Sequence, residues 1–261
     1  MDLEESCWAG RELGTPALPA DAFGLAFALV ADERRDVACV LRASYRLPGE
    51  YAQRYGGRID AAIALVAVDR LTGTVHAGDL EGVPGAPPLF VATPPEGGSG
   101  PVSIEGERNV ALVEHLGLAP GRGFDVFLWC DEFVSRLESL DVPSLAAPEG
   151  ARPFVFAETE GRDTGAPRGE LELARVGERF EGGAWLPGRA TGPLPLTLLC
   201  LHRSSRALAW RATTVPPRES ASAEWSFSVA LDAVRPRASG THFALAVAGG
   251  LRADALAFEV S

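Results

Sequence analysis

Short stretches in which apolar and polar residues alternate recur along this chain, and they constrain its fold more than any other feature. In the segment DVACVLRASYRL (36–47), every second side chain belongs to one face: Val37, Cys39, Leu41, Ala43, Tyr45 and Leu47. The other face carries Arg42, Ser44 and Arg46. Alternation with a period of two is typical of a strand that is buried on one side only.

Further strands are expected in pairs joined by turns. IALVAVDRLTGTVHAGDL (63–80) and LPLTLLCLHRSSRALAWRA (194–212) each have the pattern of a hairpin. In the first, Gly73 supplies the left-handed conformation that a bulged turn needs. Twenty prolines and 29 glycines are spread along the chain, which favours many short strands. VALVEHLGL (110–118) is the best helix candidate, at one or two turns. We therefore predict an all-β protein.

The two halves of the chain follow a similar order. With a shift of 119 residues, Val110 to Leu112 fall on Val229 to Leu231, Gly121 falls on Gly240, and Phe124 falls on Phe243. With a shift of 133, the hairpin at 63–73 falls on the hairpin at 196–206, the turn being the shared feature. The order of strands and turns indicates a duplicated unit, although the alternative of two unrelated runs of generic strands stays open.

Each half ends on a pattern that resembles the last three strands of immunoglobulin-like sandwich modules. The pattern is Val-x-Leu, then Gly-x-x-Phe at the start of an alternating strand, then a closing strand such as LAFEV (256–260). The resemblance implies two tandem antiparallel β-sandwich domains and no particular activity. It departs from the antibody pattern, because the second half has no counterpart of Cys39 and Cys130, so we expect these thiols to be free.

These observations divide the chain into four parts. We predict a flexible N-terminal arm over 1–21, a first sandwich over 22–145, a linker over 146–153 and a second sandwich over 154–261.

Composition limits the partners. With 24 basic and 35 acidic residues the formal net charge is -11, which disfavours nucleic acid and anionic membrane surfaces. The chain has no run of about 18 apolar residues that would span a membrane. Its first residues lack the features of a signal peptide, so we expect a cytoplasmic protein, with leaderless export left open.

Signals of catalysis and of cofactor or metal binding are weak. The chain has no G-x-S-x-G, phosphate-binding loop, HExxH or calcium-loop motif, so we predict neither an enzyme nor a cofactor. The four histidines are interpreted as surface or edge residues: His76, His115, His202 and His242. In CDEF (130–133), the acidic neighbours would raise the pKa of the thiol, and we interpret the segment as a solvated turn.

The aromatic residues give the most informative functional signal. In GFDVFLWC (123–130), Phe124, Val126 and Leu128 should face the core, which leaves Phe127 and Trp129 on the other face. With the shift of 119, their counterparts would be Ala246 and Ala248. A surplus of large aromatics on one face indicates an interaction surface, or a surface that another part of the chain covers.

Other tryptophans divide into anchors and core. Trp8 in the N-terminal arm and Trp185 in the loop GGAWLPG (182–188) are candidate anchors, which completes the predicted interaction set. Leu208, Trp210 and Ala212 are expected in the core, as are Trp225 and Phe227.

These features favour a non-enzymatic structural or protein-interaction protein, including self-association. The alternatives are a ligand-binding module, for example for carbohydrate, and an enzyme with a site built from loops.

Overall fold

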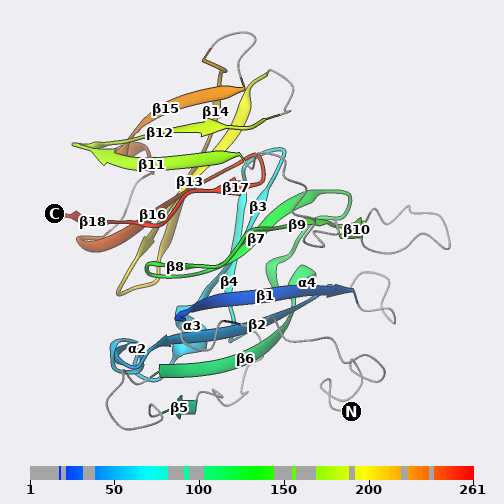
Figure 1. Ribbon diagram of the computed structural model, residues 1–261, viewed down its shortest axis with the longest axis vertical. Coiled ribbons are helices and arrows are strands. Elements are labelled where there is room, and N and C mark those ends of the chain that lie inside the picture. Colours follow the sequence, from blue (N-terminus) through cyan, green and yellow to red (C-terminus); the bar gives the residue numbers. More distant parts are fainter. Residues whose placement is uncertain are drawn as a thin grey trace.

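A computed structural model describes residue 18 and the ranges 22–31, 39–81, 91–93, 103–143, 155–156, 169–187, 192–218, 223–234 and 238–261. The strands form four antiparallel sheets in two pairs, which confirms the all-β, two-sandwich fold (Figure 1). The predicted arm, apart from Leu18, and the linker at 146–153 lie outside the described residues. The predicted domain boundaries therefore stay predictions.

The first sandwich consists of sheets A and B. Sheet A has the order β1 (Gly24–Ala31), β2 (Cys39–Pro48), β6 (Ser103–Ala111) and β5 (Val91–Thr93). Sheet B has the order β10 (Val155–Phe156), β9 (Glu138–Asp141), β7 (Gly123–Cys130), β3 (Ala64–Asp69) and β4 (Val75–Asp79), and β8 (Phe133–Val134) pairs with β7. Among the described residues, three short helices accompany them: α2 (Glu50–Arg54), α3 (Ile59–Ala62) and α4 (Leu112–Leu116).

The second sandwich consists of sheets C and D. Sheet C has the order β11 (Glu170–Val176), β12 (Arg179–Trp185) and β15 (Glu224–Ala230). Sheet D has the order β14 (Leu208–Val215), β13 (Leu194–His202), β16 (Gly240–Ala248) and β17 (Leu251–Arg252), and β18 (Leu256–Val260) also pairs with β16. One helical turn, α5 (Leu231–Val234), follows β15.

Both sandwiches have the same strand connectivity. The order β1-β2-β6 in sheet A corresponds to β11-β12-β15 in sheet C, and β4-β3-β7-β9 in sheet B corresponds to β14-β13-β16-β18 in sheet D. Helix α4 follows β6 as α5 follows β15, at the positions that the shift of 119 residues predicts. VALVEHLGL contributes a single helical turn, as expected.

The shift of 119 is wrong by one residue for β7 and β16. Cys130 pairs with Phe133 around one two-residue turn, and Ala248 pairs with Leu251 around the other. Cys130 therefore corresponds to Ala248, and Trp129 to Val247. Because side chains alternate between faces, this slip exchanges core and outer face, and Ala246 and Ala248 belong to the second core. The contrast of Phe127 and Trp129 with two alanines was thus an error of register.

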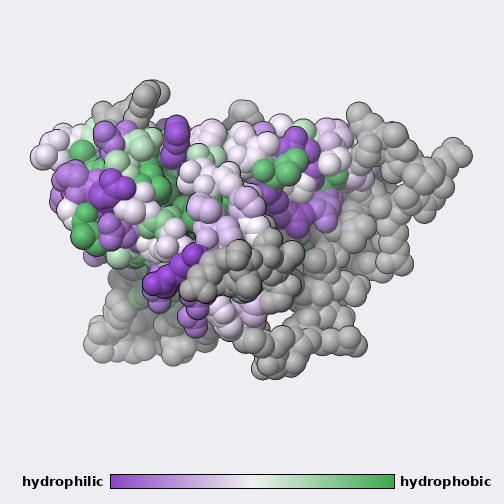
Figure 2. All heavy atoms as spheres, turned by 90° about the horizontal axis from the view of Figure 1, so that it is seen from above, coloured by the Kyte–Doolittle hydropathy of each residue, from purple (hydrophilic) through white to green (hydrophobic). Residues whose placement is uncertain are grey.

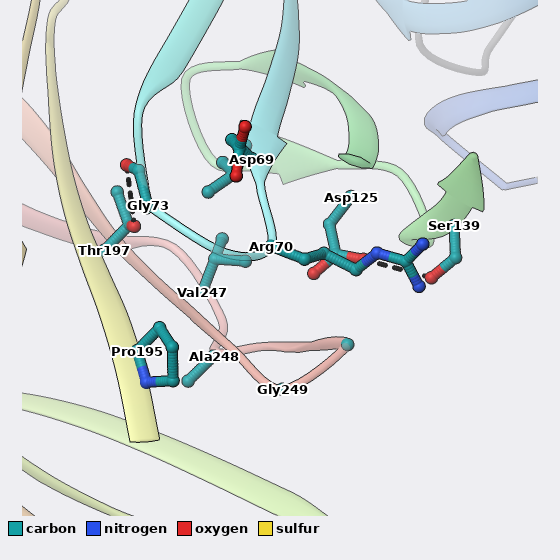
Figure 3. A pocket seen from close by; sticks show the side chains of 12 residues that line it. Asp69, Arg70, Gly73, Asp125, Ser139, Pro195, Thr197, Val247, Ala248 and Gly249 are labelled. Atoms are coloured by element: carbon teal, nitrogen blue, oxygen red, sulfur yellow. Dashed lines mark hydrogen bonds between the residues drawn. The ribbon is translucent and has the colours of Figure 1, made fainter. Parts of the chain in front are cut away.

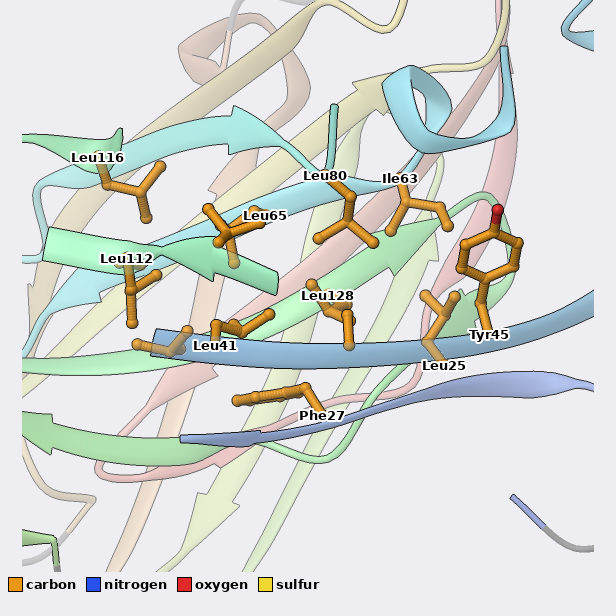
Figure 4. Packing of buried hydrophobic residues seen from close by; sticks show 14 of the residues in the cluster. Leu25, Phe27, Leu41, Tyr45, Ile63, Leu65, Leu80, Leu112, Leu116 and Leu128 are labelled. Carbon is orange, nitrogen blue, oxygen red and sulfur yellow. The ribbon is translucent and has the colours of Figure 1, made fainter. Parts of the chain in front are cut away.

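Three apolar clusters set the order of the layers. One fills the space between sheets A and B, where leucines such as Leu41, Leu65 and Leu128 interdigitate (Figure 4). A second lies between sheets C and D, around Phe180 and Trp225. The third lies between sheets B and D. The sheets are therefore stacked in the order A, B, D, C, from the bottom to the top of Figure 1.

Candidate functional site at the joint between the sandwiches

Phe127 and Trp129, the aromatic pair of the predicted interaction face, are fully buried at 0% exposure. They lie on the face of sheet B that packs against sheet D, so the second sandwich covers them. Of the two interpretations left open for this face, a surface for a partner and a surface covered by another part of the chain, the structure agrees with the second.

This joint is a continuous apolar layer. Sheet B contributes four side chains, Val66, Val68, Phe127 and Trp129, and sheet D contributes five, Leu199, Leu201, Phe243, Leu245 and Val247. All nine are 0–3% exposed. Burying one such side chain contributes roughly 1.5–3 kcal/mol, so separating the sandwiches would expose a surface that strongly favours contact.

At one edge of this layer lies a buried carboxylate, that of Asp131 in the β7–β8 turn. The residue has φ 53°, a left-handed conformation that Asp adopts more readily than most residues. Its backbone oxygen accepts a hydrogen bond of 2.7 Å from the indole Nε1 of Trp129. Its carboxylate, 0% exposed, accepts one of 2.6 Å from the hydroxyl of Tyr55.

Three arginines surround this carboxylate. Arg54 of α2 donates to it at 2.9 Å from the first sandwich. Arg206, in the β13–β14 turn of the second sandwich, donates at 2.8 Å, and Arg203 of the same turn lies at 3.6 Å. Asp131 therefore joins the two sandwiches through charged hydrogen bonds. The interpretation of CDEF as a solvated turn was wrong for this residue.

Two further side chains, those of Arg252 and Thr197, donate hydrogen bonds across the joint. Arg252 of β17 donates to the backbone oxygens of Ser135 at 2.6 Å and Val134 at 3.2 Å. Thr197 of β13 donates to the backbone oxygen of Gly73, in the β3–β4 turn, at 3.1 Å (Figure 3). An apolar centre with a polar rim is the anatomy of a stable protein interface.

A cavity of about 380 Å³ opens beside this joint, between the β3–β4 and β16–β17 turns (Figure 3). Asp125 lines it, is 3% exposed and accepts a hydrogen bond of 3.0 Å from Ser139. Burial raises the pKa of the Asp125 carboxyl, although Ser139 opposes this shift. Burial therefore disfavours the charged form of Asp125 relative to that of an exposed aspartate.

A second cavity, of about 500 Å³, lies against β13, β14, β16 and α5. His202 and His242 line it, with ring centroids 4.7 Å apart and exposures of 8% and 2%. Their interpretation as surface or edge residues was wrong, because both are buried and lie on β13 and β16, the inner strands of sheet D. Burial lowers the pKa of His242, and His202 lowers it further. Within the described ranges, no group of three or more residues could hold a metal ion.

The buried cysteines are free, as expected: Cys39, Cys130 and Cys200. Burial raises the pKa of each thiol to about 12, so the nucleophilic thiolate is scarce at neutral pH. At Cys130 the neighbouring carboxylates add to this effect, in the direction that the sequence predicted.

The remaining tryptophans differ from expectation. Trp185 ends strand β12 and does not lie in a loop, and it is 37% exposed. Trp210, expected in the core, is 40% exposed on β14. Trp8 lies outside the described residues.

Sequence reasoning missed the role of Asp131 and its arginines. Arg54 and Arg206 are 77 and 75 residues from Asp131 in the chain, so no local pattern connects them. The one available signal was positional, because CDEF and HRSSR each form the turn of a predicted hairpin.

No protein-family model matches the chain, and no curated protein has a significantly similar sequence. Among the described helices, the longest have five residues, and none is long and apolar enough to cross a membrane.

Proposed function

We propose that this chain is a non-enzymatic structural or protein-interaction protein, built of two immunoglobulin-like sandwiches held as one rigid body. The observation that carries the proposal is the joint, where nine apolar side chains and the Asp131 cluster fix sheet B against sheet D. Such a body presents its outer sheets and turns to partners in a fixed relative orientation, which suits a scaffold.

The strand order supports the immunoglobulin-like part of the proposal. In each sandwich one sheet contains three corresponding strands, to which β5 adds a fourth in sheet A, and it faces a sheet in which two central strands are flanked by a hairpin partner and the closing strand. This arrangement is similar to that of immunoglobulin-like modules that lack the inter-sheet disulfide. The free state of Cys39 and Cys130 agrees with it, and also supports the proposed cytoplasmic location.

The buried polar groups at the joint also favour a structural role. The Asp131 carboxylate forms ion pairs with three arginines and accepts a hydrogen bond from one tyrosine. Arg252 donates to backbone carbonyls. These contacts connect parts of the chain. Since Phe127 and Trp129 are buried between sheets B and D, association with a partner or a second copy would use outer surfaces.

The direct experiment is to recover the tagged full chain from extract of its source cells after chemical cross-linking, and to measure its mass by light scattering. The proposal expects a stoichiometric protein partner or a defined oligomer, with cross-links to residues on outer surfaces. A monomer without any specific cross-linked protein, over a wide concentration range, would contradict it.

The second candidate function is ligand binding, including carbohydrate binding. It is favoured by the 500 Å³ cavity with its paired histidines and by the exposed ring of Trp185. A panel of sugars should then quench tryptophan fluorescence or shift the histidine ring signals in NMR spectra. The absence of any response across a broad panel would remove this support.

A further inference from the structure

The outer face of sheet C forms one end of the four-sheet stack. Leu171, Phe180, Ala184, Trp225 and Phe227 face the second core, so the residues that alternate with them face outward. We name six of these the Trp185 face: Glu170, Glu172, Glu181, Gly183, Trp185 and Glu224. Figure 2, from above the molecule as drawn in Figure 1, shows polar and apolar side chains interspersed over this end.

Strand register places Trp185 between two carboxylates. Trp185 pairs with Glu170 of β11 on one side and with Glu224 of β15 on the other. Side chains paired in this way lie about 5 Å apart at Cβ. Two positions along β12, Gly183 has no side chain, so the indole is not covered from that direction. Trp185 is thus 37% exposed, and both of its cross-strand neighbours carry a carboxylate.

The carboxylates of this face are only partly neutralised. Glu170 and Glu172 form no ion pair with described residues, and Glu181 accepts a hydrogen bond of 3.2 Å from Ser228. Glu224 forms an ion pair of 4.0 Å with the exposed Arg218, so the unneutralised charge of this face lies on Glu170 and Glu172. Like charges on neighbouring positions of a sheet are destabilising, and a cation bound between them would relieve that repulsion.

We propose that the Trp185 face binds lysine or arginine side chains of a basic protein partner. The cation lies over the indole, where the ring quadrupole attracts it, and the flanking carboxylates accept its hydrogen bonds. The net charge of -11 favours the approach of such a partner. This inference rests on the proposed interaction function and names the chemistry of the partner.

Trp210 provides a matched contrast. It is 40% exposed, against 37% for Trp185, but it pairs with Leu199 and precedes Arg211 in β14. It therefore has similar exposure without carboxylates across the strand. A cation that recognises any exposed indole would bind both residues, whereas the proposal predicts binding at Trp185.

The test is a titration of the full chain with a decalysine peptide, followed by NMR of the indole N–H signals. Trp185→Phe and Trp210→Phe assign the two signals. We expect a saturable shift at Trp185, no comparable shift at Trp210, and loss of binding at 1 M salt. Glu170→Gln/Glu172→Gln should weaken binding roughly fivefold, the scale of two exposed ion pairs.

The control is Glu107→Gln/Glu114→Gln, which changes the net charge equally at exposed positions of the first sandwich. Its affinity should stay within about twofold of the wild type, since distant exposed charges are screened. Equal weakening by both double variants, or equal shifts at both tryptophans, would overturn the proposal. So would a sugar that shifts Trp185 when decalysine does not.

The same variants separate this inference from the proposed function. If a cross-linked partner is recovered equally well with Glu170→Gln/Glu172→Gln, the Trp185 face is not its site, although the interaction function stands. If decalysine binds at Trp185 but the source extract yields no partner or oligomer, the face binds cations and the proposed function fails.

Discussion

Asp131→Asn tests the charged cluster at the joint most cleanly. Asparagine keeps the size of the side chain and tolerates the φ of 53°, so the substitution removes charge without adding backbone strain. It leaves the guanidinium groups of Arg54, Arg203 and Arg206 around a neutral amide. Alanine at this position would mix the electrostatic effect with the cost of a left-handed conformation.

The expected loss follows from burial. Breaking a buried ion pair by removing one partner costs about 3–5 kcal/mol. The Asp131 carboxylate is 0% exposed, but the three arginines retain 28%, 33% and 16% exposure, so water compensates them in part. We therefore expect the lower end of the range, about 3 kcal/mol of unfolding free energy.

Urea denaturation at pH 7 measures this loss. For a slope near 3 kcal/mol/M, a loss of about 3 kcal/mol lowers the midpoint by about 1 M. The control is Asp254→Asn, because Asp254 is fully exposed beside Arg252, and its midpoint should not change. A midpoint for Asp131→Asn that equals that of the wild type would refute a stabilising role of the cluster.

Three further predictions concern buried groups. Trp129→Ala should lower the free energy of unfolding by roughly 3–5 kcal/mol, because it leaves a cavity in the joint. In calorimetry the two sandwiches should then melt in two separate transitions, and a single transition would contradict this. Asp125→Asn should raise the melting temperature at pH 7 but not at pH 3. Burial raises the pKa of Asp125 above 3.8, so the native state loses stability as pH rises through that raised pKa. An equal change of melting temperature at both pH values would argue against this reasoning. At pH 8, iodoacetamide should label the thiols of Cys39, Cys130 and Cys200 only after unfolding, which peptide mass spectrometry would show. Labelling of these thiols in the native chain would contradict their burial.

The strands were predictable wherever one face is solvated or a turn residue is diagnostic. The alternation from Cys39 to Leu47 predicted β2. Gly73, with φ 70°, lies in the turn of the β3–β4 hairpin, as expected. Strand β1, GLAFALVA, was not predicted, because its side chains are apolar or small and show no clear alternation of polarity.

The joint could not be predicted, because β7 and β16 are buried on both faces. Such strands are nearly continuous in apolar residues, and nothing in their pattern indicates which face belongs to which core. A slip of one residue in the repeat then exchanged the two faces of β16. Asp131 was missed for a different reason: turns are usually solvated, and the arginines that bury this one come from distant parts of the chain.

The central claim is that the two sandwiches form one rigid unit, because sheets B and D pack directly against each other. Hydrogen exchange of the Trp129 indole N–H, followed by NMR in the full chain, tests it most directly. This N–H donates to the backbone oxygen of Asp131 at 2.7 Å inside the joint. We predict that it exchanges as slowly as the buried indole of Trp225, which donates to Gly192 at 2.9 Å. Exchange as fast as that of the exposed Trp185 and Trp210 would show that the joint opens, and would contradict the claim.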